Sequence, residues 1–343
     1  MKSLLYIGNK LSKLNNNPST IETLSRQLQQ EGFKVTAVSG YQNKVLRLLH
    51  MWFAIVLHSR KTDAVLIDVY STLNFWYAYS CSLLCRVFDI PYIPILHGGN
   101  LPARFQNNPK QAMALVNNAY KTVIPSAYLK QHLAAFNLPR VEVIPNTIDL
   151  ENYSFKQRSN LQPNLLWVRA IDGIYNPEMA LQTLALVQKE FPEAKLTMVG
   201  PYKSISETAW QQTLKKYKLS VQMTGKVTKE EWIALAASHS VFINTTKIDN
   251  MPVSLMEAMA LGLPVVSTNV GGIPYLIQHE VSGLLVPSND APAMAGAVIR
   301  LLHSETLIAT LTLKARKAIE KYDWKTAAVQ WKTLFEAEEI NKL

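Results

Sequence analysis

Residues 244–286 read NTTKIDNMPVSLMEAMALGLPVVSTNVGGIPYLIQHEVSGLLV. Two carboxylates in this stretch, Asp249 and Glu257, stand eight residues apart around a turn and the start of a helix. A strand over 264–267 and a Gly271-Gly272 turn follow. Such a unit sets backbone N–H groups and a helix N-terminus, which favour anions, beside two acids. It suits a ligand with an anionic end and a hydroxyl-rich end.

Strands and helices alternate on both sides of this stretch. Repeated βα units with apolar strands predict parallel sheets covered by helices on both faces, with ligands bound at the carboxyl ends of the strands. The polar segment 151–163 separates two such runs, so we expect two Rossmann-like domains, 1–155 and 156–320, and a final helix within 321–343. The strands are expected at 4–7, 34–39, 64–69, 92–96, 122–125, 141–144, 164–168, 195–199, 221–224, 241–244, 264–267 and 283–286.

The composition is that of a globular chain, with 48% hydrophobic and 17% charged residues over a length of 343, enough for two domains. The sequence contains no run of 18 apolar residues without a charge, so it predicts no membrane-spanning helix. The start, MKSLLYIGNK, reads as a strand rather than a signal peptide. Cys81 and Cys85 stand one helical turn apart without metal-binding neighbours, which predicts buried thiols and, by default, a cytoplasmic protein.

The net charge of +10 is uneven along the chain. Residues 1–150 carry 15 Lys and Arg against 7 Asp and Glu, a balance of +8, whereas residues 151–343 carry 20 against 18, a balance of +2. A basic half suggests an anionic partner, which is nucleic acid, a membrane surface or a phosphorylated substrate.

A helix expected at 45–57 is a candidate for the membrane alternative. No acid occurs between Glu31 and Asp63. Basic residues with interfacial aromatics on one helix are typical of lipid-binding surfaces. A buried core helix with solvated ends is the competing interpretation. The residues that suggest lipid binding are Lys44, Arg47, Trp52, Phe53, Arg60 and Lys61.

Four further motifs surround the opening stretch in a fixed order: VIPNTIDLENY at 143–153, LLWVRAIDGIYNP at 165–177, LTMVGPY at 196–202 and YDWKTAAVQWKTLF at 322–335. Together with DNMPVSLMEAMALGLPVVSTNVGGIP at 249–274, they resemble glycosyltransferase family 4. The resemblance implies an α/β chain of the GT-B fold, in which two Rossmann-like domains turn their parallel sheets toward a central cleft. It also implies a retaining enzyme that uses a nucleotide sugar, with an acceptor-side first domain, a donor-binding second domain and a final helix that crosses back to the first domain.

Site residues follow from the same resemblance. Arg169 would bind the donor pyrophosphate, His97 would lie at the donor sugar, and Asp249 would reach the hydroxyl groups of that sugar. Glu257 would bind the ribose, and Gly8 would let the first loop approach the substrates. Backbone N–H groups of Met251, Val253 and Ser254 would face phosphate. The competing interpretations are a surface salt bridge for Arg169, a turn pair for Asp249, and structural roles for Glu257, His97 and Gly8.

The chain departs from the family pattern at several positions. Asp249 replaces the first glutamate of the family's E-x7-E motif, and Tyr275 stands where another glutamate is expected. In the first loop, Pro18-Ser19 replaces a Gly-Gly pair. The lysine expected after Arg169 is absent, and Tyr175, Asn176 and Pro177 fall there. Lys203 and Lys247 are the candidate phosphate contacts in its place. No Asp-x-Asp motif stands in a suitable loop, so we expect neither metal nor cofactor.

These observations predict a hexosyltransferase that is cytoplasmic, or peripheral on the inner membrane face. It would act on a carbohydrate or lipid-linked acceptor in cell-envelope or polysaccharide assembly. An inverting transferase or a sugar-phosphate epimerase is the alternative within the fold, and an inverting enzyme needs a base that Asn15–Asn17 do not offer. A nucleic-acid-binding protein and a non-catalytic scaffold are the alternatives outside it.

Overall fold

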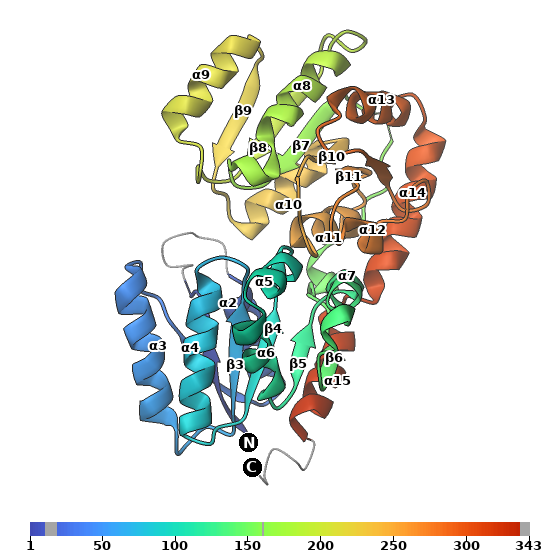
Figure 1. Ribbon diagram of the computed structural model, residues 1–343. Coiled ribbons are helices and arrows are strands. Elements are labelled where there is room, and N and C mark those ends of the chain that lie inside the picture. Colours follow the sequence, from blue (N-terminus) through green and yellow to red (C-terminus); the bar gives the residue numbers. More distant parts are fainter. Residues whose placement is uncertain (11–18, 160, 337–343) are drawn as a thin grey trace. The chain divides into compact units, whose positions relative to one another are not determined.

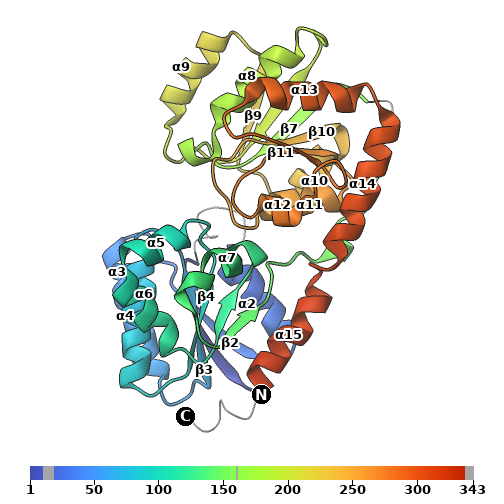
Figure 2. The ribbon, with the colours of Figure 1, turned by 45° about the vertical axis from the view of Figure 1, so that its right-hand side comes forward.

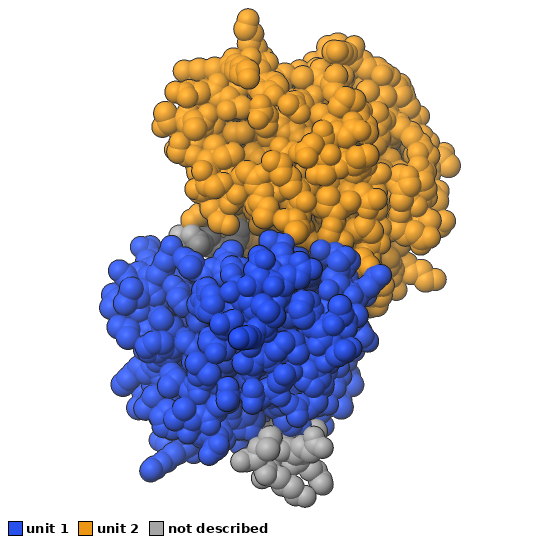
Figure 3. All heavy atoms as spheres, viewed as in Figure 1, with its two compact units in different colours: residues 1–146, 324–343 blue, residues 147–323 orange. Residues whose placement is uncertain are grey.

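The computed structural model describes residues 1–10, 19–159 and 161–336, so the Asn15–Asn17 segment and Pro18 lie outside the described residues. The chain forms two compact units, drawn in different colours in Figure 3. Unit 1 comprises Met1–Asn146 together with the chain from Trp324 onward, and unit 2 comprises Thr147–Asp323. The expected boundaries were 155 and 320.

Unit 1 contains a parallel six-stranded sheet in the order β2-β1-β3-β4-β5-β6 (Figure 1). Its strands are β1 (Ser3–Ile7), β2 (Lys34–Val38), β3 (Ala64–Val69), β4 (Tyr92–Leu96), β5 (Thr122–Ile124) and β6 (Val141–Val143). Its helices are α2 (Thr20–Gln30), α3 (Lys44–His58), α4 (Asn74–Val87), α5 (Leu101–Asn107), α6 (Pro109–Asn117), α7 (Ala127–His132) and α15 (Trp324–Glu336), with a 3₁₀ turn η1 (Ala134–Phe136).

Both faces of this sheet are covered, because alternate side chains of each strand enter different cores. In β1, Leu5 and Ile7 pack with α3 to α7, whereas Leu4 and Tyr6 pack with α2 and α15. Figure 2 shows α15 on the α2 side of the sheet. Trp324 Nε1, on α15, donates to Glu31 Oε1 over 3.2 Å. The last helix is therefore part of the first sheet's covering layer.

Unit 2 repeats the architecture with a parallel sheet in the order β12-β11-β10-β7-β8-β9. Its strands are β7 (Asn164–Val168), β8 (Lys195–Val199), β9 (Val221–Gly225), β10 (Val241–Asn244), β11 (Val265–Thr268) and β12 (Leu284–Val286). Its helices are α8 (Pro177–Val187), α9 (Glu207–Tyr217), α10 (Lys229–Ser238), α11 (Val253–Ala260), α12 (Ile273–Leu276), α13 (Ala291–Leu302) and α14 (Glu305–Glu320), with 3₁₀ turns η2 (Leu150–Asn152) and η3 (Gly173–Tyr175).

Two arginines hold the C-terminal end of α11, the helix that carries Glu257. Arg316 Nη1 donates to Ala260 O over 2.7 Å and to Tyr153 O over 2.8 Å. Arg158 is 7% exposed and donates to four carbonyl oxygens, among them Leu261 O. Burial lowers the pKa of Arg158. The last carbonyls of a helix lack partners within the helix, so these guanidinium groups fix α11 in place.

The structure bears on two expectations from the sequence, the buried cysteines and the absence of a membrane-spanning helix. Cys81 and Cys85 are free and buried, as predicted, and burial raises the pKa of the Cys85 thiol to about 12. Across the described residues, no single helix has both the length and the apolar character needed to cross a membrane. Among the described helices, only α13 and α14 taken together reach that length and composition, and the two are bent by 104°.

Candidate active site

Each sheet has one pair of neighbouring strands after which the chain continues toward opposite edges of the sheet. In unit 1 this pair is β1 and β3, and in unit 2 it is β7 and β10. Ligands of open parallel sheets bind outside the carboxyl ends of the strands at such switch points. Gly8 directly follows β1, and Arg169 directly follows β7. The loop 245–252, with Asp249, follows β10. Several predicted site residues therefore sit where the topology favours ligands.

Arg169 and Asp249 form an ion pair at the switch point of unit 2. Arg169 Nη2 donates to Asp249 Oδ2 over 2.5 Å, and the two side chains are 16% and 18% exposed. The guanidinium also lies over the Tyr175 ring, 4.9 Å from its centroid, which is a cation–π contact. Its Nε is buried and has no hydrogen-bond partner in the described part of the chain. The planar group is thus held from two sides and keeps N–H donors for an oxyanion.

Glycines let other backbone segments approach both members of this pair. A Cβ built on Gly200 would lie 1.9 Å from Arg169 O, and one built on Gly271 would lie 2.0 Å from Asp249 O. Gly271 also has φ +54°, which favours glycine. Gly272 N donates to Asp249 O over 2.9 Å. The Gly-Gly turn is therefore the platform on which the loop with Asp249 rests.

Gly272→Ala tests this close approach alone, because Gly272 has φ −84°, which alanine adopts without strain. The added Cβ would lie 1.8 Å from Asn250 O. We expect the free energy of unfolding to fall by about 1–3 kcal/mol. Turnover should fall about 10²-fold, since a displacement near 1 Å in a site can cost that much. The measurements are urea denaturation and donor turnover.

Gly296→Ala, in α13, is the matched control, because no described atom outside the adjoining helix backbone lies within 4 Å of a Cβ built there. Alanine within a helix should slightly stabilise the protein. If both glycine variants unfolded at the same urea concentration, the close approach at Gly272 would have no energetic weight.

Helix α11 begins directly after the loop that carries Asp249. Its N-cap residue is Pro252, whose carbonyl oxygen accepts from the N–H groups of Leu255 and Met256. The N–H groups of Val253 and Ser254 lie ahead of the helix's own hydrogen bonds. Ser254 Oγ is buried without a hydrogen-bond partner among the residues described. The first turn of α11 therefore offers donors of the kind that phosphate accepts.

Two predicted donor contacts differ in how their side chains are placed. The Met251 side chain is 7% exposed and packs in the core of unit 2, so its predicted role depends on its backbone. Val253 is 39% exposed at the first position of α11.

Glu257 is 4% exposed, and both of its carboxylate oxygens accept from protein donors. Tyr153 Oη donates to Oε1 over 2.9 Å, and Trp232 Nε1 donates to Oε2 over 2.9 Å. The Lys229 amine, on a side chain that is 37% exposed, pairs with Oε1. A ribose hydroxyl would share this carboxylate with Lys229. The ribose contact stays a prediction, and these partners also fit the alternative of a buried structural acid.

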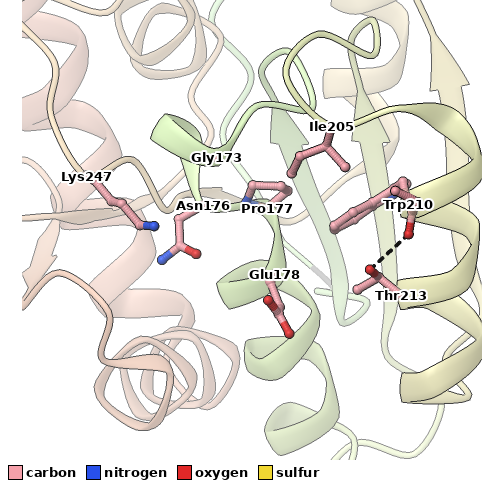
Figure 4. A pocket seen from close by; sticks show the side chains of 9 residues that line it. Gly173, Asn176, Pro177, Glu178, Ile205, Trp210, Thr213 and Lys247 are labelled. Carbon is pink, nitrogen blue, oxygen red and sulfur yellow. Dashed lines mark hydrogen bonds between the residues drawn. The ribbon is translucent and has the colours of Figure 1, made fainter.

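The two candidates for the missing lysine have different surroundings. The Lys203 amine is 3.3 Å from Asp172 Oδ2, and its side chain is 63% exposed. Lys247 N donates to Ile174 O over 2.8 Å, which ties the loop after β10 to the turn η3. Figure 4 shows the Lys247 amine pointing toward Asn176, at a small cavity between α8 and α9. Lys247 therefore lies beside the segment where the family lysine is missing.

His97 belongs to a buried polar cluster at the switch point of unit 1. His97 Nε2 is 3.0 Å from Asp68 Oδ1, and the two side chains are 6% and 3% exposed. Tyr6 Oη donates to the same oxygen over 2.7 Å. The Tyr70 ring stacks on the imidazole with centroids 5.5 Å apart. Gly8 closes the cluster, because a Cβ there would lie 2.5 Å from Asp68 Oδ2.

The protons in this cluster can be assigned from its chemistry. Burial, followed by the charge of Asp68, raises the pKa of Tyr6 and of Tyr70 above the ordinary value of 10.0. Both phenols therefore stay protonated near neutral pH. An ionised carboxylate only accepts hydrogen bonds, so Asp68 Oδ1 accepts from Tyr6 and from the Nε2–H of His97. This contact fixes the tautomer of a neutral His97.

Sequence reasoning missed four partners of the predicted residues. Asp68 carried a signal, since it is the one charged residue in the apolar strand AVLIDV. Tyr153 lies in a quoted motif, VIPNTIDLENY, without having been assigned a role. Lys229 and Trp232 belong to α10 and carry no local signal that links them to Glu257.

Both halves of the chain are similar in sequence to known protein families. The family model described as "Glycosyltransferase Family 4" matches residues 19–152, and the one described as "Glycosyl transferases group 1" matches residues 162–304. The amylovoran biosynthesis glycosyltransferase AmsK of Erwinia amylovora is 28% identical over 284 residues, which are 78% of this chain and 69% of AmsK. The sulfoquinovosyl transferase SQD2 of Arabidopsis thaliana is 27% identical over 61% of this chain and 43% of its own length.

Solved structures share the whole fold. The sucrose-phosphate synthase of Thermosynechococcus elongatus has a TM-score of 0.81 at 18% identity and covers 98% of both chains. HepE of Anabaena has a TM-score of 0.78 at 17% identity and covers 100% of both chains. The two six-stranded parallel sheets and these matches define the GT-B fold. The chain belongs to the glycosyltransferases in which a Family 4 domain precedes a group 1 domain.

Proposed function

We propose that this enzyme moves a sugar from a nucleoside-diphosphate sugar to a carbohydrate or lipid-linked acceptor, with retention at the anomeric carbon. The observation that carries the proposal is Arg169, fixed at the switch point by Asp249 and Tyr175 with a buried N–H donor to spare. A pyrophosphate has oxygens that can accept hydrogen bonds from this guanidinium and from the N–H groups in the first turn of α11.

Relatives support the substrate classes. HepE was crystallised in complex with UDP-glucose, and AmsK is named for the biosynthesis of amylovoran. A nucleotide-sugar donor and an acceptor from polysaccharide or cell-envelope assembly are therefore the classes we propose. The proposed location is the cytoplasm, with an acceptor presented at the inner membrane face.

The proposed reaction breaks the bond between the anomeric carbon and the leaving phosphate oxygen. Positive charge grows on the sugar ring and negative charge on the pyrophosphate. Arg169 and the N–H groups of Val253 and Ser254 would stabilise the negative charge, so the proposed reaction needs no metal. In a front-face mechanism, which the family resemblance implies, the leaving phosphate takes the acceptor's proton. The protein then supplies orientation and charge stabilisation rather than a base.

Lys247 is our proposal for the missing family lysine. Its loop is joined to η3 through Lys247 N and Ile174 O, and its amine lies at Asn176. Lys203 is instead paired with Asp172 at the surface. Lys247 therefore holds a cation closer to the expected place in the fold.

Donor binding tests this function directly. We expect UDP-sugars or GDP-sugars to raise the unfolding temperature, because a ligand at 100 times its dissociation constant adds about 2.7 kcal/mol of stability. Release of nucleoside diphosphate, unchanged by EDTA, and an NMR assignment of the product anomer would then test metal independence and retention. No stabilisation by any nucleotide sugar would remove the proposed donor class.

A further inference from the structure

Helix α3 exposes an apolar stripe. In a helix with about 100° per residue, the six side chains of the stripe lie within about 120° of its circumference. The opposite side of the helix, with Met51, Ala54 and Ile55, is buried in the core of unit 1. The stripe comprises Val45, Leu46, Leu49, Phe53, Val56 and Leu57, which are between 47% and 66% exposed.

The neighbouring helix extends the same character. Helix α4 packs beside α3 (Figure 1), and Trp76, Leu83 and Val87 of α4 are exposed. The region from Tyr41 to Phe88 holds 12 of the 18 large hydrophobic side chains exposed in the described part of the chain. Scattered exposed apolar residues are ordinary, whereas such a concentration marks an interaction surface.

The charged side chains of α3 and of the segments that flank it along the chain are all of one sign, and the nearest exposed acid of the neighbouring helix is Asp89, directly after α4. Exposed Lys44 precedes the stripe, exposed Arg60 and Lys61 follow it, and no acid occurs from Gly32 to Thr62. Apolar side chains combined with cations and without acids match a surface that has acyl chains beneath anionic headgroups. A protein partner would need an apolar face with acids at both ends of the helix, and nothing in the unit selects such a partner.

Two residues assigned to this surface by the sequence belong elsewhere. Arg47 is 8% exposed, and its guanidinium donates to Tyr41 O over 2.7 Å, to Gln42 O over 3.2 Å and to Asn9 Oδ1 over 3.0 Å. Trp52 Nε1 donates to a hydroxyl oxygen of α4. The outward face of α3 is therefore apolar with cationic ends, and Arg47 holds the preceding loop.

We propose that α3 lies in the interface of an anionic membrane, with the apolar stripe in the outer acyl region and Lys44, Arg60 and Lys61 at the headgroups. The inference rests on the proposed acceptor at the inner membrane face and adds which helix contacts that membrane. Because the stripe supplies apolar contact, binding should survive salt in part, whereas a purely electrostatic contact would be screened.

Sedimentation with vesicles tests the proposal on the full chain. The vesicles are neutral phosphatidylcholine and phosphatidylcholine mixed with anionic phosphatidylglycerol. We expect the protein to bind the anionic vesicles. Changing Leu49, Phe53 and Leu57 to Gln should weaken this binding about tenfold or more, because each change removes apolar area that the membrane would bury. Lys44→Gln with Arg60→Gln and Lys61→Gln should remove the preference for anionic lipid.

The matched control changes exposed apolar residues away from the stripe, Leu313→Gln and Val329→Gln, which are 53% and 64% exposed in the parent chain. It should bind vesicles like the parent. Equal binding by the stripe variant, or no binding by the parent, would overturn the proposal. A parent dimer in gel filtration that the stripe variant loses would assign the stripe to a second copy. Donor-induced thermal stabilisation, expected to be unchanged in every variant, separates this outcome from a failure of the proposed donor.

Discussion

Arg169→Ala is expected to lower kcat/KM by about 10²–10³-fold, the usual cost of one lost contact to developing charge. The guanidinium is held by Asp249 at 2.5 Å and by the Tyr175 ring, so its remaining N–H donors are already oriented. Orientation before binding is what makes such donors effective in a transition state. The measurement is the release of nucleoside diphosphate at subsaturating donor.

Controls distinguish the phosphate role of Arg169 from its pairing with Asp249. Arg169→Lys keeps the charge but loses the planar set of donors, so it should recover only part of the activity. Arg169→Ala should unfold at nearly the parent temperature, because the side chain is partly exposed and its guanidinium donates to Asp249 alone among the described residues. Turnover close to the parent in Arg169→Ala would remove Arg169 from the catalytic machinery.

Glu257→Ala would be a poorer test of the donor site. The substitution leaves Tyr153 Oη, Trp232 Nε1 and the Lys229 amine without their common acceptor. Buried donors without a partner cost about 1–3 kcal/mol each. Lost stability and lost activity would therefore appear together in that variant.

The architecture was predictable because buried parallel strands read as continuous apolar runs. The strand expected at 164–168 is β7, and the one expected at 241–244 is β10. Residues that follow these strands, such as Arg169 and Asp249, were therefore placed correctly at the strand ends.

Partners distant in sequence were out of reach of the same reasoning. Tyr153 and Glu257 are 104 residues apart, and their contact depends on how α11 is rotated against the segment before β7. Arg47 illustrates the same limit at short range. A cation on an apolar helix was assigned to the lipid face, yet loop carbonyls of Tyr41 and Gln42 draw it inward. Side-chain direction is a tertiary property that one sequence does not specify.

Asp68→Asn is expected to lower kcat about as far as His97→Ala does, by about 10²–10³-fold for the loss of one oriented contact. Asp68 Oδ1 accepts from His97 Nε2–H and from Tyr6 Oη, so its charge selects the imidazole tautomer. An asparagine can turn its amide N–H toward Nε2 and select the other tautomer. Asp68 would thus be a positioning residue for His97, whose role at the donor sugar is part of the proposed function.

A double-variant cycle separates positioning from a merely structural role. If Asp68 acts only through His97, the variant with both changes should be no slower than the slower single variant, because residues that act as a unit are strongly non-additive. Tyr6→Phe is the matched control. It removes one hydrogen bond from Asp68 but keeps the carboxylate charge, so it should lower thermal stability with a smaller effect on kcat. If the two losses in kcat instead multiply in the double variant, Asp68 acts independently of His97. Two residues that act through one contact would lose that contact's contribution to kcat only once.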